Sequence, residues 1–184
     1  AMIGLPGLEC ESMLLDHYGE GFPLAEINKA YAVHRDDLLA RGLPLKPGTM
    51  ELLDALRDAE CPMALVTSSS RRTADHYLML AGIRERFEAI LTRDDVTRGK
   101  PHPDLYLLAA ERLGVAPKTC IAVEDSGPGV TAAHAAGAMT LMVPDILQPT
   151  DEIRAKCVVV LPDLHAVLVL LRERYDFGTV ARTI

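Results

Sequence analysis

The chain has 184 residues, 49% of them hydrophobic, and a formal net charge of −7. This length supports one sizeable core, and this hydrophobic share excludes a natively disordered chain. The acidic balance disfavours a general nucleic-acid binder, and no apolar run approaches the length that spans a membrane.

The four cysteines are far apart in the sequence and form no Cys-x-x-Cys pair; they are Cys10, Cys61, Cys120 and Cys157. This spacing is typical of small core residues in a reducing compartment rather than of a disulfide framework or a zinc site. We therefore expect a cytoplasmic protein.

The first part of the chain is predicted to be helical. Apolar residues recur at helical spacing over residues 9–18 and 24–40, and no strand pattern interrupts them. Residues 1–43 are therefore expected to form a small helical subdomain. His34 and Arg35 lie on its second helix, where a solvated face is favoured over a contact with substrate.

A connector rich in Pro and Gly at residues 42–48 separates this subdomain from the rest. Beyond it, helices are predicted at residues 49–60, 71–81, 103–113, 130–136 and 164–174. Strands are predicted at residues 62–67, 89–92, 120–124, 139–143 and 157–160. Strands that alternate with helices indicate an α/β fold with a parallel sheet, and the near-continuous apolar strands indicate helices on both faces.

Three segments at predicted strand or helix ends carry candidate chemistry. The first is Val-Thr-Ser-Ser-Ser at residues 66–70, followed by Arg71 and Arg72. Hydroxyls and amide groups at a helix start can bind an anion, and the arginines add positive charge. The alternative is ordinary capping of the helix by Ser69 or Ser70.

The second segment is Gly-Lys-Pro-His-Pro-Asp at residues 99–104. Its two prolines fix the backbone around Lys100, whose ammonium could act as a point charge on a phosphoryl oxygen. The alternative is a surface loop that starts a helix with Pro103 in its first turn.

The third segment is Cys-Ile-Ala-Val-Glu-Asp-Ser-Gly-Pro-Gly at residues 120–129. Glu124 and Asp125 end a buried strand, where they repel each other unless a hard cation such as Mg²⁺ lies between them. The alternative is that Asp125 or Ser126 caps the next helix. All three segments would meet at one edge of a parallel sheet, and together they suit a phosphate ester.

Residues 45–170 resemble the haloacid dehalogenase superfamily, in its β-phosphoglucomutase-like phosphatase branch. The matching segments occur in the family's order: Leu-Lys-Pro-Gly at 45–48, Ala-Leu-Val-Thr-Ser-Ser at 64–69, Gly-Lys-Pro-His-Pro-Asp at 99–104, Val-Glu-Asp-Ser-Gly-Pro-Gly-Val at 123–130, and Ala-Ala-Gly at 135–137.

The resemblance implies a Rossmann-like core at residues 44–184 and a partial helical cap at residues 1–43. It implies that Thr67, with Ser68 beside it, binds phosphate. Lys100 would steady the phosphoryl group and the nucleophile, so that Thr67 and Lys100 are the catalytic candidates. Glu124 and Asp125 would hold Mg²⁺ directly or through water.

The family's first motif, an apolar strand ending in Asp-x-Asp, has no counterpart here. Asp36-Asp37 and Asp94-Asp95 lack both the spacing and the preceding strand. The absent strand is central in the family, so its neighbours would lie too far apart to hydrogen-bond. We therefore expect the native polypeptide to have an N-terminal segment beyond these residues. Two alternatives are a gap closed by rearrangement and a strand donated by a second chain.

The function that this resemblance implies is a Mg²⁺-dependent phosphatase acting on a small phosphorylated metabolite, a sugar or polyol phosphate. The full-length protein would react through an aspartyl-phosphate, and the 184-residue chain is expected to be inactive. One alternative is a sugar phosphomutase, which is less favoured because Gly-Leu-Pro-Gly-Leu at residues 4–8 lacks the expected arginine. Another is a non-catalytic protein that binds phosphometabolites or a partner protein.

Overall fold

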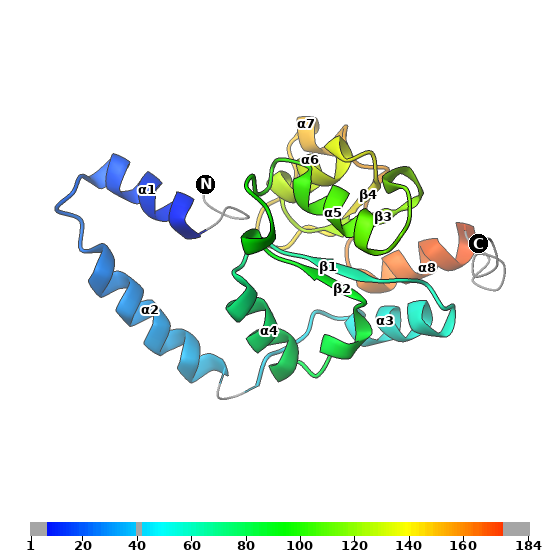
Figure 1. The fold of residues 1–184 in the computed structure, drawn as a ribbon, viewed down its shortest axis with the longest axis horizontal. Coiled ribbons are helices and arrows are strands. Elements are labelled where there is room, and N and C mark those ends of the chain that lie inside the picture. Colours follow the sequence, from blue (N-terminus) through cyan, green and yellow to red (C-terminus); the bar gives the residue numbers. More distant parts are fainter. Residues whose placement is uncertain (1–6, 40–41, 175–184) are drawn as a thin grey trace.

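The fold is described from a computed structural model, which defines residues 7–39 and 42–174 (Figure 1). Its helices are α1 (Gly7–Tyr18), α2 (Leu24–Leu39), α3 (Thr49–Asp58), α4 (Arg71–Leu80), α5 (Asp104–Arg112), α6 (Gly127–Ala135), α7 (Asp151–Arg154) and α8 (Leu164–Arg174). Short 3₁₀ turns lie at Arg84–Arg86, Arg93–Asp95 and Pro117–Thr119. The predicted α/β class is confirmed.

The strands form two separate parallel sheets within residues 42–174 (Figure 1). In the first, β1 (Ala64–Val66) pairs with β2 (Ala89–Leu91), with Ala64 opposite Ala89. In the second, β4 (Met139–Met142) lies between β3 (Ile121–Glu124) and β5 (Val159–Val160), with Ile121 opposite Met139. Among the described residues, β1 pairs only with β2, and β3 pairs only with β4. No described strand pairs with both β1 and β3.

Each helix and strand expected between residues 44 and 174 is present, but several ends differ. The helix expected at 130–136 begins at Gly127, because the Ser126 side chain accepts a hydrogen bond from the Gly129 N–H and Pro128 is tolerated in a first turn. The strand expected at 157–160 is only two residues long, because the Cys157 N–H bonds back to Arg154 O. The sequence reading missed α7, which Thr150 caps.

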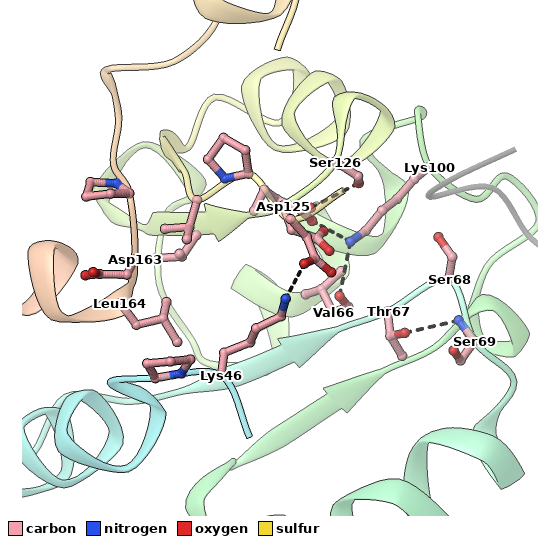
Figure 2. Close-up of a pocket in the computed structure, with 17 residues that line it drawn as sticks. Lys46, Val66, Thr67, Ser68, Ser69, Lys100, Asp125, Ser126, Asp163 and Leu164 are labelled. Carbon is pink, nitrogen blue, oxygen red and sulfur yellow. Dashed lines mark hydrogen bonds and ion pairs between the residues drawn. The ribbon is translucent and has the colours of Figure 1, made fainter. Parts of the chain in front are cut away.

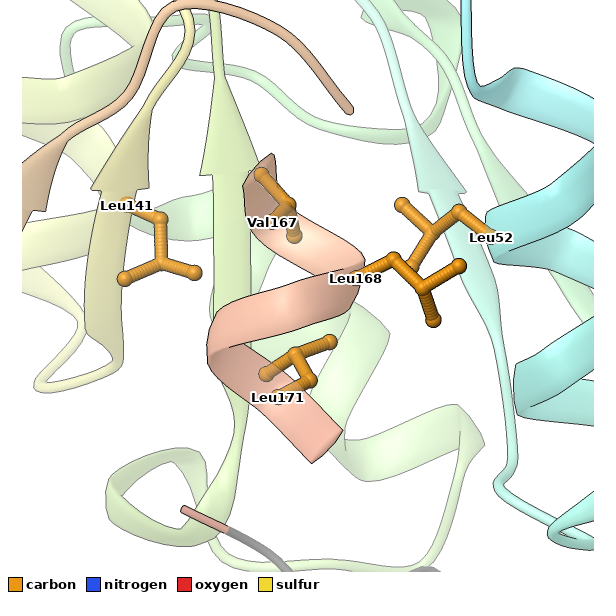
Figure 3. Packing of buried hydrophobic residues seen from close by; sticks show 5 residues of the cluster. All are labelled: Leu52, Leu141, Val167, Leu168 and Leu171. Atoms are coloured by element: carbon orange, nitrogen blue, oxygen red, sulfur yellow. The ribbon is translucent and has the colours of Figure 1, made fainter. Parts of the chain in front are cut away.

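One face of the core joins the two sheets through α3 and α8. Figure 3 shows α8 lying between Leu141 of β4 and Leu52 of α3. Val167, Leu168 and Leu171 on α8 complete this buried cluster. Since α3 precedes the first sheet and β4 belongs to the second, apolar packing connects the sheets here.

The opposite face is covered by α5, which packs on β1 and β2 and also contacts α6 beside the second sheet. Its Leu105 is completely buried and clusters with Leu91 and Ala109, against which Ala64 and Val66 also pack. Helices on both faces therefore hold the two sheets in one unit.

The helices α1 and α2 extend away from this core (Figure 1). The Asn28 amide donates to Glu11 at 2.8 Å, which links one helix to the other. The rings of Tyr18 and Phe22 stack at 4.9 Å, while Tyr31 remains 65% exposed. Within the described ranges, no helix is both long and apolar enough to cross a membrane.

Candidate phosphate and cation site

A cavity of about 760 Å³ opens at the carboxyl ends of β1, β3 and β4 (Figure 2). Carboxyl ends of parallel strands meet at one edge of a sheet, where α/β proteins bind ligands. The cavity brings together all the residues that the sequence predicted for the site: Thr67, Ser68, Lys100, Glu124 and Asp125.

The segment after β1 forms the hydroxyl side of the cavity. The Thr67 hydroxyl oxygen accepts a hydrogen bond from the Ser69 N–H at 3.1 Å, which fixes its position beside the strand end (Figure 2). Ser70 caps α4 by accepting from the Thr73 N–H. Ser70 therefore caps the helix, whereas Thr67 and Ser68 line the cavity.

Arg71 does not supply the positive charge expected of it at this cavity. Its guanidinium donates to Asp95 at 2.8 Å and to the Ile90 carbonyl at 2.7 Å, and its backbone N–H donates to Asp94. Arg71 therefore ties the start of α4 to the segment around β2, and Arg72 is not among the cavity-lining residues.

Lys100 is buried, with 6% of its surface exposed, and joins the two sheets. Its ammonium donates to Glu124 Oε1 at 2.5 Å and to the Val66 carbonyl at 3.1 Å (Figure 2). Val66 ends β1 and Glu124 ends β3, so this one side chain spans the space between the sheets. The reading of residues 99–104 as a plain surface loop is therefore wrong for Lys100.

Glu124 is also buried, at 6% exposure, and its carboxylate turns into the protein. Besides Lys100, the Tyr106 hydroxyl donates to Oε1, and the Ser126 hydroxyl donates to Oε2 at 3.4 Å. A Cβ on residue 129 would overlap this carboxylate, so any residue larger than glycine there would displace the Glu124 side chain. The side chain of Glu124 is consequently fixed by three donors.

Tyr106 was not singled out from the sequence. Burial of its hydroxyl, followed by the negative charge of Glu124, raises the pKa of Tyr106 well above its usual range. The phenol therefore stays protonated and donates to Glu124. The Lys100 ammonium also lies 5.4 Å from the centre of the Tyr106 ring.

Asp125 differs from its neighbour because its carboxylate faces the cavity (Figure 2). Partial enclosure, and then the negative charge of Glu124, raise the pKa of Asp125. A carboxylate whose ionised form is disfavoured in this way gains most from a bound cation. Asp125 fits a hard cation through oxygen, although no group of three His, Cys, Asp or Glu side chains in the described part could enclose a metal.

The sequence reading also missed residues at the cavity rim. Lys46, from the connector, forms an ion pair with Asp145, and Asp163 lies before α8 (Figure 2). Asp145 could have been found from the sequence, because it closely follows the strand expected at 139–143 and ligands bind at the carboxyl ends of such strands. Lys46 carries no such signal. His34 and Arg35 are not among the residues that line the cavity, and residues 4–6 of the mutase segment lie outside the described residues.

Comparison with protein families matches residues 2–137 to the haloacid dehalogenase-like hydrolases. The chain is 37% identical over 131 residues to hexitol phosphatase A of Escherichia coli. This alignment covers 70% of this chain and 60% of that protein. The chain is 31% identical over 136 residues to a phosphorylated carbohydrates phosphatase of Thermotoga maritima. This alignment covers 74% of this chain and 63% of that protein. The chain spans less than two thirds of either relative's length.

Solved structures share the fold. The CbbY protein of Rhodobacter sphaeroides, in complex with xylulose-(1,5)bisphosphate, is 29% identical with a TM-score of 0.75 over 89% of this chain and 75% of that one. A β-phosphoglucomutase from Clostridium difficile matches with a TM-score of 0.76 over 97% of this chain and 81% of that one, and at 21% identity it supports the fold alone. The chain therefore belongs to the haloacid dehalogenase-like hydrolase family, with neighbours in its β-phosphoglucomutase-like branch.

Proposed function

We propose that the full-length protein is a Mg²⁺-dependent phosphatase that hydrolyses a small phosphorylated metabolite, a sugar or polyol phosphate, through an aspartyl-phosphate. The observation that carries this proposal is the convergence of Thr67, Lys100 and Asp125 on one cavity at the strand ends. Its volume of about 760 Å³ lies within the range of small-molecule sites. The relatives reported above, which are named as a hexitol phosphatase and a phosphorylated carbohydrates phosphatase, support the substrate class.

Lys100 supplies the fixed positive charge in this proposal. An ammonium has three N–H donors, and two of them bond to Val66 O and Glu124. The third has no acceptor within the described residues and would bind a phosphoryl oxygen. Because Glu124 and the buried stem hold the ammonium in place, little reorganisation would accompany phosphate binding.

Thr67 and Ser68 would contact the phosphate from the β1 side. The Thr67 oxygen already accepts from the Ser69 N–H, which leaves its own hydroxyl proton to donate to a phosphoryl oxygen. Ser68 lines the same cavity and would share this role.

Asp125 would hold the Mg²⁺, and Glu124 would add negative charge behind it. When bound, the ion would neutralise charge on the phosphoryl oxygens. Since three donors already bond to the Glu124 carboxylate, Asp125 would be the residue that holds the ion, and Glu124 would contribute its negative charge.

The nucleophile in this proposal is an aspartate outside the 184 residues. None of the described cavity-lining carboxylates lies in an apolar strand ending in Asp-x-Asp. We therefore propose that the 184-residue chain binds but does not turn over its substrate.

The test is hydrolysis of a panel of sugar and polyol phosphates by the full-length protein, with Mg²⁺ and with EDTA. We expect Mg²⁺-dependent release of orthophosphate from part of the panel, and a loss of at least 100-fold for Lys100→Ala. No release from any panel member would reject the phosphatase. Accumulation of an isomerised sugar phosphate would instead identify a mutase, and binding without any conversion would identify a non-catalytic protein.

We also propose that the protein acts in the cytoplasm on a freely diffusing metabolite, without a nucleic-acid or membrane partner. All four cysteines are free thiols, which suits a reducing compartment. Their full reactivity with a thiol reagent in denatured protein purified without reductant would support this, whereas recovery of a disulfide would count against it.

A further inference from the structure

The turn that follows β2, at residues 92–95, is held together by the carboxylate of Asp95. One oxygen of this carboxylate, Oδ2, accepts hydrogen bonds from the Thr92 N–H at 2.7 Å and from the Thr92 hydroxyl at 2.8 Å. Thr92 is completely buried and comes directly after β2. Partial burial of Asp95 acts to raise its pKa, but the hydrogen bonds from Thr92 and the positive charge of Arg71 outweigh it and lower the pKa. Asp95 is therefore ionised at neutral pH.

The 92–95 turn also holds the start of α4. The Arg71 guanidinium donates to Asp95 Oδ2 at 2.8 Å, and the Arg71 N–H donates to Asp94 Oδ2 at 2.8 Å. Arg71 is the first residue of α4, directly after the segment at residues 67–70 that carries the hydroxyls of the cavity. The turn thus fixes one end of this segment through both the backbone and the side chain of Arg71.

A backbone hydrogen bond connects the 92–95 turn to the middle of the same segment. The Arg93 N–H donates to Ser69 O at 3.0 Å. The Ser69 N–H in turn donates to the Thr67 hydroxyl oxygen at 3.1 Å (Figure 2). Ser69 is therefore held by the turn through its carbonyl and holds the Thr67 side chain through its N–H.

The orientation of the Thr67 hydroxyl depends on these contacts. A threonine side chain can occupy several staggered rotamers, and a hydrogen bond to its oxygen selects among them. The bond from Ser69 does this here, and it leaves the hydroxyl proton of Thr67 to be donated elsewhere. A donor that is already oriented binds an anion with little reorganisation. The contacts that fix Ser69 are therefore expected to affect how well Thr67 binds phosphate.

We propose that Asp95 is a positioning residue for phosphate binding, which acts on the Thr67 hydroxyl through the 92–95 turn and Ser69. This inference rests on the proposed function, in which Thr67 binds the phosphate of the substrate. Asp95 is not among the residues that line the cavity, so it would act without touching the substrate. The alternative is that Asp95 stabilises the fold and has no effect on the site.

The test is the affinity of the full-length protein for orthophosphate, measured by titration calorimetry at saturating Mg²⁺. Asp95→Asn keeps the size of the side chain and removes its charge, so the ion pair with Arg71 is lost. We expect the Kd for orthophosphate to rise at least five-fold. The matched control is Asp54→Asn, because Asp54 also pairs with an arginine, Arg86, but does not line the cavity. The control should change the Kd less than two-fold.

A second comparison separates positioning from general stability. Thr67→Val removes the hydroxyl and keeps the shape of the side chain. If Asp95 acts through Thr67, Asp95→Asn should change the Kd less than two-fold in the Thr67→Val background, because coupled residues are not additive. A loss that reflected only a weakened fold would have the same size in both backgrounds.

Arg71→Gln keeps the test valid if Asp95→Asn does not fold. It removes the same ion pair and leaves Asp95 bonded to Thr92. We expect it to raise the Kd for orthophosphate at least three-fold, again only when Thr67 is present.

Two results would overturn the inference. The variants could bind orthophosphate as tightly as wild type, or the Kd could rise by the same factor with and without the Thr67 hydroxyl. In both cases the wild-type protein still binds orthophosphate, and the proposed phosphatase stands. Absence of binding by the wild-type protein would instead reject the phosphate site itself, and this inference with it.

Discussion

Glu124 and Asp125 are adjacent in the sequence but have opposite surroundings. Glu124 is buried and receives hydrogen bonds from Lys100, Tyr106 and Ser126, whereas Asp125 faces the cavity. The sequence predicted the pair as equal partners around a cation. Strand geometry explains the difference, because successive side chains of a strand point to opposite faces. One carboxylate therefore supports the site from within and the other meets the ligand.

The Tyr106→Phe substitution tests whether the Tyr106 hydroxyl stabilises the buried Glu124 carboxylate. It removes one donor from a buried carboxylate, and a hydrogen bond to a charged group is worth about 1.5–3 kcal/mol. We expect urea unfolding to show a loss of this size. The matched control is Tyr31→Phe on α2, where the side chain is 65% exposed and the loss should be below about 0.5 kcal/mol. Equal effects for both variants would contradict the role given to Tyr106.

The Asp125→Asn substitution tests the raised pKa of the Asp125 carboxyl. Because the folded pKa lies above the unfolded value, the protonated form favours folding, and this contribution is lost as the pH rises through the folded pKa. Asparagine cannot ionise. In Mg²⁺-free buffer, Asp125→Asn should therefore be more stable than wild type at pH 7, and the difference should shrink toward pH 4.

Urea unfolding at several pH values between 7 and 4 measures this difference. The exposed Asp37→Asn on α2 is the control and should show no comparable change with pH. Addition of Mg²⁺ should stabilise wild type and not Asp125→Asn. A variant that is less stable than wild type at pH 7 without Mg²⁺ would show that the ionised Asp125 is not disfavoured.

At the scale of elements, α8 connects parts of the fold that do not share a sheet. Its buried side chains contact Leu52 on α3 and Leu141 on β4 (Figure 3). Hydrogen bonds join β1 to β2 and β3 to β4 and β5, but none of the described strand pairings joins these two groups. The packing of α8 therefore carries much of the cohesion between them.

Leu168→Ala is expected to destabilise the chain by about 2–5 kcal/mol, as is usual for truncation of a buried leucine. Because Leu168 belongs to the cluster that links α3 to β4, amides of both sheets should exchange faster in the variant. Leu107→Ala on α5 is the control, since Leu107 is 44% exposed and its truncation should cost below about 0.5 kcal/mol. Faster exchange confined to α8 would show that the helix does not couple the sheets.

The sequence predicted the elements better than their ends. Short apolar runs, separated by helical segments, located β1 to β4, because buried parallel strands are almost continuously apolar. It missed α7, a single turn whose only signal is the Thr150 cap. At the site, Thr67 could be found because it follows a strand, and Lys100 because two prolines fix the loop around it. Tyr106 could not, because its contact with Glu124 joins residues 18 positions apart through tertiary packing.

For the molecule as a whole, the candidate site lies across the boundary between the two sheets. Thr67 follows β1, Asp125 follows Glu124 at the end of β3, and Lys100 bonds to both sides. A site divided in this way depends on how well the two sheets are held together.

The assignment of the nucleophile is tested most directly by measuring phosphate release. The 184-residue chain and the full-length protein are assayed in parallel on the same sugar phosphates with Mg²⁺. We predict that the full-length protein releases orthophosphate, that Asp125→Asn lowers its rate at least 100-fold, and that the 184-residue chain releases none. Turnover by the 184-residue chain that Asp125→Asn abolishes would contradict the assignment of the nucleophile to an aspartate outside these residues.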